Sequence, residues 1–283
     1  MNKVQIVCDS TLDITPELYK KYNLHVIPLH VNFGEEDYID GQTITLEQLY
    51  AKVKECGELP HTAAVSSAIF EEEFKKFIDQ GMDVVYVGIG STLSSAFQSA
   101  FIAKQSFPEG RVALIDSKNL SSASAILAIQ AAKLRDAGKS AVEIAEEVQK
   151  LVPNVIGQFT IEQFEYLYKG GRCSGAAKVM GTLLHIRPYL RVIDGKLVVY
   201  KKPRGPMKVA INEQLAGLKE DLPNVDNTVV FITHTGMAPG MVEWVKSEVE
   251  KLVDPKCVEV TTAGAVIGSH CGAGTLGILY LKK

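Results

Sequence analysis

Short apolar runs alternate with amphipathic segments along the first half of the chain. The apolar runs are rich in β-branched residues, as strands buried on both faces are, and they predict strands at residues 3–8, 25–33, 84–87 and 112–115. Helical spacing of apolar residues predicts helices at residues 16–22, 46–54, 66–78, 94–103, 119–134 and 139–151, with a loop at 60–62. This alternation favours a parallel sheet with helices on both faces.

The pattern changes after Pro153. Strands are predicted at residues 155–159, 186–193, 196–200, 229–233, 258–261 and 275–281, and helices at 162–168, 207–219 and 240–252. Asp194-Gly195 separates two of these strands and is a strong hairpin signal. We therefore expect an α/β protein of two domains, a parallel α/β/α sandwich in residues 1–152 and an α+β domain in residues 153–283.

Residues 260–281 contain no Asp, Glu, Lys or Arg and are long enough to raise the possibility of a membrane span. They also contain five glycines, so two short strands around a glycine-rich turn are the better prediction, without stable membrane insertion. The N-terminus has no apolar signal core before its first strand, which predicts a cytoplasmic location. The five cysteines are scattered without a C-x-x-C pair, which indicates neither a disulfide framework nor a zinc site.

The richest candidate chemistry follows the strand at residues 84–87, where Ser91, Thr92, Ser94 and Ser95 lead into a helix with Phe97, Ala100 and Phe101 on its apolar stripe. The first turn of a helix offers unpaired N–H groups, and serine hydroxyls add uncharged donors. Such a junction suits a carboxylate or a phosphate group. The alternative is that Ser94 only caps the helix.

Two other predicted strands end in polar residues, Asp9-Ser10-Thr11 and Asp116-Ser117. Ligands of open α/β sheets bind outside the carboxyl ends of the strands, so these ends would enclose a small polar site together with the serine-rich turn. The alternative is that each aspartate caps its own turn.

His270 lies between glycines that permit close approach to a ligand. Neighbouring residues on a strand point to opposite faces, so His270 would not activate Cys271 there. No metal-ligand spacing, nucleophile elbow or P-loop occurs in the sequence. Uncharged hydroxyls, one histidine and much apolar helix suit an amphiphile with an acidic head and an apolar tail, and the nearly charge-free residues 125–132 are the expected place for the tail.

The net charge of the chain is only −3, which gives no overall bias toward nucleic acid. Residues 169–208, however, hold ten basic residues and one acid, a net charge of +9 that leaves −12 for the rest. This basic segment predicts an acidic partner, although acids elsewhere in space could also balance it. RNA is the weaker alternative, because no aromatic stacking motif interleaves the charges.

The chain resembles the DegV family along essentially its whole length. The resemblance rests on Asp9-Ser10-Thr11, Pro60-x-Thr62, Ser94-x-x-Phe97-Gln98-Ser99-Ala100, Ile115-Asp116-Ser117, Leu167-x-x-Gly170-Gly171-Arg172, Ile186-Arg187-Pro188, Asp194-Gly195-Lys196, Lys202-x-Arg204-Gly205 and Gly264-x-Val266-Ile267-Gly268-Ser269-His270-x-Gly272-x-Gly274. It departs from the family's usual pattern at Thr62-Ala63-Ala64-Val65, at Ser94-Ser95-Ala96 and at His270-Cys271-Gly272-Ala273-Gly274.

The resemblance implies a carrier that binds one long-chain fatty acid in a tunnel between two domains. It implies no catalysis and no cofactor. It also implies a role in phospholipid metabolism, because the best understood members present the fatty acid carboxylate to a partner kinase for acyl-phosphate formation. By resemblance Thr62, Ser94 and His270 hold the carboxylate, and Arg172 and Arg204 face the phosphate or the kinase. The residues expected around the head group are Asp9, Ser10, Ser91, Ser95, Asp116 and Ser117.

Two other functions remain open from the sequence. One is a small-molecule enzyme, a phosphotransferase or hydrolase that uses His270 with Asp9 or Asp116. The other is an adaptor whose basic segment binds protein or RNA. The missing nucleophile–base spacing counts against the enzyme.

Overall fold

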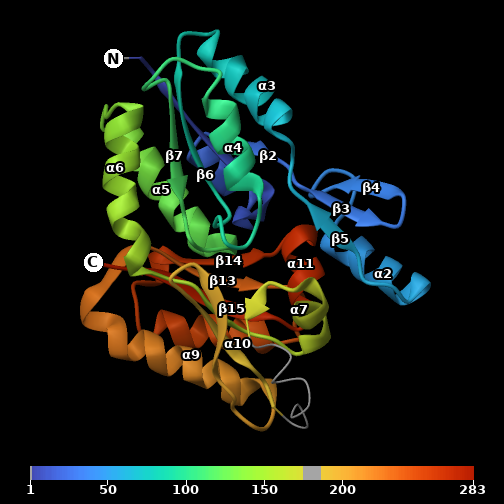
Figure 1. Ribbon diagram of the computed structural model, residues 1–283. Helices are drawn as coiled ribbons and strands as arrows, with labels where there is room; N and C mark the ends of the chain where they lie inside the picture. Colours follow the sequence, from blue (N-terminus) through green and yellow to red (C-terminus); the bar gives the residue numbers. More distant parts are fainter. Residues whose placement is uncertain (1, 175–185) are drawn as a thin grey trace.

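The computed structural model describes residues 2–174 and 186–283, which fold into two stacked units (Figure 1). The first unit is built on a parallel sheet with the strand order β2-β1-β6-β7. Residues 84–87 are buried on both faces, as their apolar run predicts. The strands of this sheet are β1 (Val4–Asp9), β2 (Leu24–Ile27), β6 (Asp83–Gly88) and β7 (Val112–Asp116).

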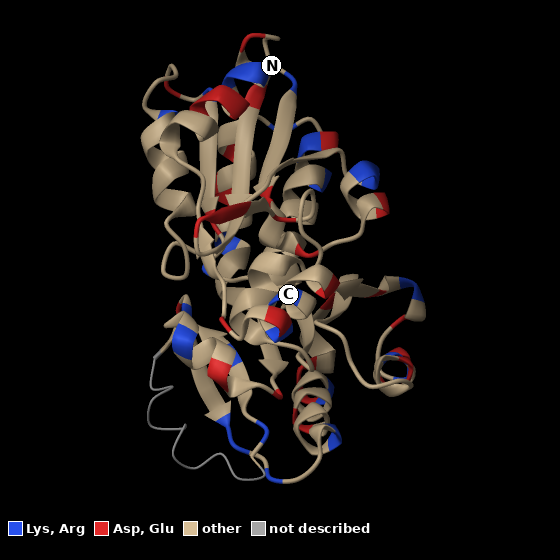
Figure 2. Cartoon of the chain, turned by 90° about the vertical axis from the view of Figure 1, so that its right-hand side faces the viewer, with Lys and Arg blue, Asp and Glu red and all other residues tan. Residues whose placement is uncertain are grey.

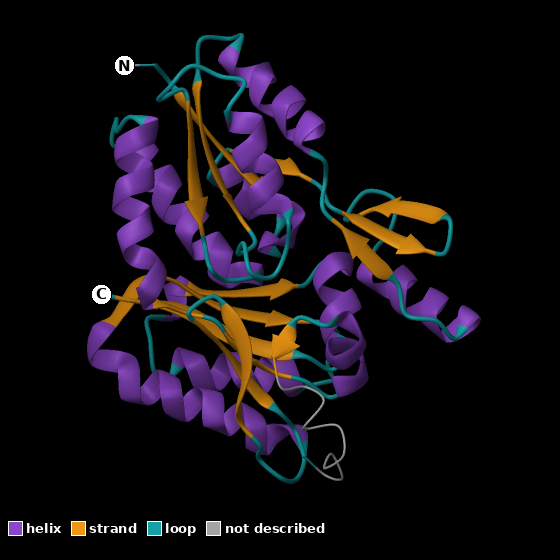
Figure 3. Ribbon diagram, in the orientation of Figure 1, coloured by secondary structure: helices purple, strands orange, loops and turns teal. Residues whose placement is uncertain are grey.

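Helices cover both faces of this sheet, which confirms the predicted α/β/α sandwich (Figure 3). One face packs against α3 (Ser67–Ile78) and α4 (Ala96–Lys104), and the other against α5 (Ser121–Asp136) and α6 (Ala141–Leu151), while α1 (Pro16–Lys21) follows the short 3₁₀ turn η1 (Ser10–Leu12). Because α5 also packs against the second sheet, it has no solvent face for charged residues over most of its length. Phe101, predicted on the buried stripe, is instead 46% exposed.

The second unit is a mixed sheet whose strand order is β10-β12-β11-β9-β15-β13-β14, with β8 paired to β15. The predicted hairpin is confirmed, since Asp194 and Gly195 both adopt the positive φ angles that a tight two-residue turn needs. The helices α9 and α10 pack on one face of the sheet. The elements are β8 (Val155–Ile156), β9 (Gln158–Thr160), α7 (Phe164–Gly170), β10 (Cys173–Ser174), β11 (Tyr189–Ile193), β12 (Lys196–Lys201), α9 (Met207–Asp221), β13 (Val225–His234), α10 (Met241–Glu250), β14 (Val258–Thr262) and β15 (Leu276–Lys282).

A small antiparallel sheet projects from the first unit beside α2 (Leu46–Cys56), and two predictions are wrong here. Residues 25–33 form two strands in different sheets, β2 and β3 (His30–Phe33), because Pro28 interrupts the run between them. Residues 60–62 are not all loop, since β3 pairs with β5 (His61–Ala63) as well as with β4 (Glu36–Ile39). This small sheet and α2 pack against α11 (Ala265–Cys271), which follows β14 of the second sheet.

The helix α11 itself contradicts the prediction of two strands around a glycine-rich turn in residues 260–281. The strands β14 and β15 do form, but the glycine-rich stretch between them is helical. Across residues 2–174 and 186–283, we find no helix with the length and apolar character that crossing a bilayer requires. The uncharged run is therefore explained by burial, since six of the seven residues of α11 are buried.

Candidate functional site

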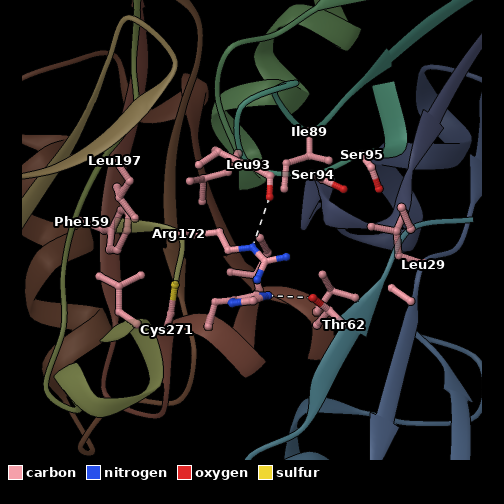
Figure 4. A pocket seen from close by; sticks show the side chains of 17 residues that line it. Leu29, Thr62, Ile89, Leu93, Ser94, Ser95, Phe159, Arg172, Leu197 and Cys271 are labelled. Carbon is pink, nitrogen blue, oxygen red and sulfur yellow. Dashed lines mark hydrogen bonds between the residues drawn. The ribbon is translucent and has the colours of Figure 1, made fainter. Parts of the chain in front are cut away.

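A cavity of about 320 Å³ lies where the two units meet, at the carboxyl ends of the strands of the first sheet (Figure 4). This volume is at the small end of the range of about 300–1,000 Å³ that is typical of ligand pockets. Most of its wall is apolar. The first unit contributes Leu29, Ile89, Leu93 and Leu120, the end of β5 and the residue after it contribute Ala63 and Ala64, and the second unit contributes Phe159, Leu167, Leu197, Val266, Ile267 and Cys271.

The polar part of the wall comes from Thr62, Ser94, Ser95, Arg172 and His270. The structure therefore brings together the three residues expected to hold a head group, although they come from β5, from the turn before α4 and from α11. The Oγ atom of Ser94 also accepts a hydrogen bond of 3.2 Å from the backbone N–H of Ala96. Ser94 thus bonds to the first N–H of α4 and also lines the cavity, whereas the N-cap position itself is Ser95.

His270 is joined to Thr62 by a contact of 2.8 Å between Nε2 and the hydroxyl Oγ1. Its other ring nitrogen, Nδ1, is buried without a hydrogen-bond partner among the described residues. Burial, and to a lesser extent the positive charge of Arg172, lowers the pKa of His270 from 6.5 to about 4. The ring is therefore neutral near pH 7.

The neutral ring determines which way the Thr62 hydroxyl points. A buried N–H without an acceptor is rarer and more costly than a buried lone pair without a donor. The favoured tautomer therefore carries its proton on Nε2, which donates to Thr62 Oγ1. The hydroxyl proton of Thr62 is then available for an acceptor in the cavity, as a bound anion would be.

Arg172 supplies the positive charge beside this hydroxyl (Figure 4). Its Nη1 donates to the carbonyl of Gly170 at 2.6 Å, and its Nε makes a long contact of 3.5 Å with the carbonyl of Leu93. The side chain therefore reaches from the turn after α7 toward the loop that follows β6. Arg204, the other predicted phosphate-facing residue, lies between β12 and α9, is exposed and does not line the cavity.

The predicted convergence of the strand ends is wrong for Asp9. Its carboxylate is fully buried and accepts hydrogen bonds from Tyr86 Oη at 2.8 Å, from the N–H of Ile89 at 2.9 Å and from Thr11. Burial raises the pKa of the Asp9 carboxyl, although these hydrogen bonds partly offset the effect. Asp9 therefore fixes the turn after β1, as the alternative interpretation proposed.

The other predicted neighbours of the head group are also held away from it. Asp116 accepts from both the N–H and the hydroxyl of Ser91, at 3.0 and 2.6 Å, and neither residue lines the cavity. Ser117 bonds within its own turn and to Ser124, and Ser10 donates to Asp40. Of the six residues expected around the head group, only Ser95 lines the cavity.

Cys271 lines the cavity from α11, so the argument from strand alternation was wrong. The conclusion that it is not an activated nucleophile has other support, because burial raises the pKa of its thiol to about 12.

Residues 125–132 do not line the cavity but pack in the core between the two sheets. The cavity therefore does not reach the place expected for an acyl tail, and sequence reasoning missed Leu197 and Phe159 in its wall.

The basic segment is partly balanced by acids that lie elsewhere in the sequence. Ion pairs join Lys169 to Glu165, Arg187 to Glu162 and Lys201 to Glu213. Within the part of the chain that the structure describes, no ion pair involves Arg172, Lys196, Lys202 or Arg204, and Lys178 lies outside that part. The unbalanced charge is therefore smaller than +9. Figure 2 shows basic positions along the lower loops of the second unit, whereas Arg172 of this segment lines the cavity.

The sequence is similar to one known family from end to end. A family described as "Uncharacterised protein, DegV family" matches residues 3–283. A DegV domain-containing protein of Clostridium acetobutylicum is 30% identical over 285 residues, which is 100% of both chains. A second, from Caldanaerobacter subterraneus, is 31% identical over 288 residues, again covering 100% of each chain.

Solved structures show the same similarity in three dimensions. A DegV family protein of Thermus thermophilus, described as fatty acid binding, superposes with a TM-score of 0.92 at 28% identity over 99% of this chain and 100% of its own. The fatty acid binding protein DegV of Bacillus subtilis gives 0.85 at 26% identity, with 100% of both chains covered. A stearic acid-binding protein of Eubacterium ventriosum gives 0.85 at 25% identity over 100% of this chain and 99% of its own.

Proposed function

Because this chain belongs to the DegV family, we propose that it binds one long-chain fatty acid in the cavity and presents the carboxylate to an ATP-dependent partner kinase. The observation that carries the proposal is the Thr62 hydroxyl, which neutral His270 orients and which lines a mostly apolar cavity together with Ser94. Further support comes from the similar structures, which are described as binding fatty acids or stearic acid.

The polar end of the cavity suits a carboxylate better than a neutral head group. The hydroxyls of Thr62 and Ser94 would each donate to an ionised oxygen, and such charge-assisted bonds are about twice as strong as neutral ones. The guanidinium of Arg172 would face the phosphate that approaches this carboxylate. An acyl tail along the apolar walls would gain about 0.8 kcal/mol for each CH₂ group it buries.

The second half of the proposal concerns transfer chemistry in a partner. A carboxylate oxygen would attack the γ-phosphorus of ATP, the bond to the β–γ bridging oxygen would break, and ADP would leave, which produces an acyl phosphate. The sequence contains no P-loop, so the nucleotide would arrive on the partner. In this proposal the chain itself only binds and orients the carboxylate, in the cytoplasm, as one step of phospholipid metabolism.

Mass spectrometry of lipids extracted from the purified, denatured protein tests the first half of the proposal. We expect a long-chain fatty acid in near-stoichiometric amount. A protein that contains no lipid and does not take up added fatty acid would overturn the proposal. Co-purified RNA or turnover of a small phosphate ester would support one of the two functions that the sequence left open.

Ser94 provides the simplest test of the head-group assignment. Replacing Ser94 by Ala removes one donor to the carboxylate and should weaken fatty acid binding by about 1–3 kcal/mol. Ser91→Ala is a matched control, because Ser91 is held by Asp116 outside the cavity. A displacement titration with a fluorescent fatty acid measures both variants, and equal affinities would remove Ser94 from the site.

Ala64 provides a test of where the tail lies. It is half-buried in the cavity wall, so Ala64→Leu should narrow the space and shift the retained lipids toward shorter chains. Ala51→Leu makes the same change on the exposed face of α2 and should leave the lipid profile unaltered. The profiles are read by mass spectrometry, and identical profiles for the two variants would place the tail elsewhere.

Arg172 and Arg204 test the contact with a kinase. Replacing either by Ala should leave lipid retention nearly intact and abolish acyl-phosphate formation with the cognate kinase and ATP, since arginine binds phosphate through its planar fork. Association should weaken as salt rises, because exposed charges would carry it. Lipid loss in either variant would make that arginine a head-group ligand, and full transfer would remove it from the contact.

A further inference from the structure

Two buried carboxylates take no part in the site described so far. Asp13 and Asp40 are 4% and 3% exposed, and both accept hydrogen bonds from the start of α11. Asp13 Oδ1 accepts from the N–H of Gly264 at 2.7 Å, and Asp40 Oδ1 accepts from the N–H of Ala265 at 2.7 Å. They therefore satisfy donors that the first turn of any helix leaves unpaired.

The second oxygen of each carboxylate ties α11 to another part of the chain. Asp13 Oδ2 accepts from the hydroxyl of Ser121, the first residue of α5. Asp40 Oδ2 accepts from Ser10 Oγ at 2.7 Å, and Ser10 Oγ in turn accepts from the N–H of Leu29 at 3.1 Å. Each aspartate thus joins α11 to one neighbouring segment through paired hydrogen bonds.

These tied segments are the ones that form the cavity. Leu29 lines it directly, Leu120 lines it immediately before Ser121, and α11 contributes His270. The two aspartates therefore fix α11 relative to two other parts of the cavity wall, one near Leu29 and one near Leu120. His270 is part of α11 and contacts Thr62. A shift of this helix would therefore move the His270 ring away from the Thr62 hydroxyl that it orients.

The hydrogen bond between Ser121 and Asp13 joins two residues that both have an unusual backbone conformation. Asp13 and Ser121 have φ angles of 52° and 56°, in the left-handed region that residues other than glycine rarely adopt. Such conformations cost about 1–3 kcal/mol each and persist where the surrounding structure over-determines them. The hydrogen bond between these two side chains is one of the interactions that hold both conformations.

From this arrangement we propose that Asp13 and Asp40 are positioning residues for the head-group site, which set α11 so that His270 orients Thr62 toward a carboxylate. The inference rests on the proposed fatty acid binding and adds two residues that touch neither ligand nor cavity contents. It predicts that losing either carboxylate harms recognition of the acid head more than binding of the apolar tail.

The test compares a long-chain fatty acid with the fatty alcohol of the same chain, titrated against Asp13→Ala and Asp40→Ala. We expect acid affinity to fall at least tenfold in each variant and alcohol affinity to change less than threefold, so the acid-to-alcohol ratio falls. Asp13→Asn should restore the ratio, because its amide oxygen can still accept from Gly264. Asp116→Ala is the control, since Asp116 is a carboxylate that neither lines the cavity nor bonds to α11.

The possible results separate this inference from the function on which it rests. Wild-type protein that binds neither ligand, or does not prefer the acid, would contradict the proposed function itself. A wild-type preference that survives in both alanine variants, or an equal loss of both ligands, would overturn the positioning role. If Asp40→Ala fails to fold, Ser10→Ala removes only the link to Asp40 and to Leu29, and an unchanged ratio in that variant counts against the inference.

Discussion

Replacing Gly170 by Ala is expected to disable the head-group site while leaving the cavity walls in place. A Cβ atom at Gly170 would lie 2.4 Å from Nδ1 and 3.3 Å from Cε1 of His270, far inside contact distance. The ring cannot easily move aside, because its Nδ1 is buried and its Nε2 is hydrogen-bonded to Thr62. Overpacking of this kind costs about 1–3 kcal/mol. If that cost falls on the ligand-binding conformation, fatty acid affinity drops about 5- to 150-fold.

The neighbouring glycine provides a matched control for this change. Gly171 has a φ of +69° and nothing within 4 Å of its Cβ position, so Gly171→Ala strains the backbone without touching His270. We expect Gly171→Ala to lower thermal stability but to keep fatty acid affinity, whereas Gly170→Ala loses affinity. The titration and the melting curve are measured for both variants. Wild-type affinity in Gly170→Ala would show that the ring is free to move and that its position is not needed.

Acid should destabilise the protein through His270. Its pKa is about 4 when folded against 6.5 for the ordinary side chain, so the unfolded chain binds more protons between these values. The contribution of His270 to stability is therefore fully present above pH 6.5 and is lost as the pH falls toward 4. The expected size of this loss is on the order of 3 kcal/mol.

The effect is isolated by comparison with His270→Gln, which has no titrating group but keeps an amide donor for Thr62. Burial raises the pKa of Asp9, Asp13 and Asp40, and these groups favour the folded state at low pH, so only the difference between the two proteins reports on His270. Urea unfolding at several pH values should show the two free energies converging from pH 6.5 to pH 4. A constant difference would mean that His270 titrates normally.

Several elements of the fold could be predicted because their causes are local. The hairpin at Asp194-Gly195 follows from turn chemistry, and the buried strand at residues 84–87 follows from its apolar run. The helix α11 could not be predicted in this way, because the carboxylates that satisfy its first turn, Asp13 and Asp40, are more than 200 residues away in sequence. Its glycines and small residues carry no local helix signal.

The candidate site shows the same division between local and distant causes. Asp9 and Asp116 looked like site residues because they follow strands, but nearby N–H and hydroxyl groups use their oxygens. Thr62 and His270 are separated by 208 positions, and family resemblance rather than spacing suggested that they belong together. The wall residue Leu197 depends on how the two units pack, which no pattern along the chain reports.

The most direct test of the account is the NMR signal of a fatty acid labelled with ¹³C at its carboxyl carbon. We predict one bound signal, distinct from that of free fatty acid, that stays in its ionised position at a pH where the free acid is protonated. Thr62→Val and Ser94→Ala should each move this signal, and Ser91→Ala should not, because Ser91 bonds to Asp116 away from the cavity. A bound signal that neither Thr62→Val nor Ser94→Ala moves would contradict the claim that these hydroxyls hold the carboxylate.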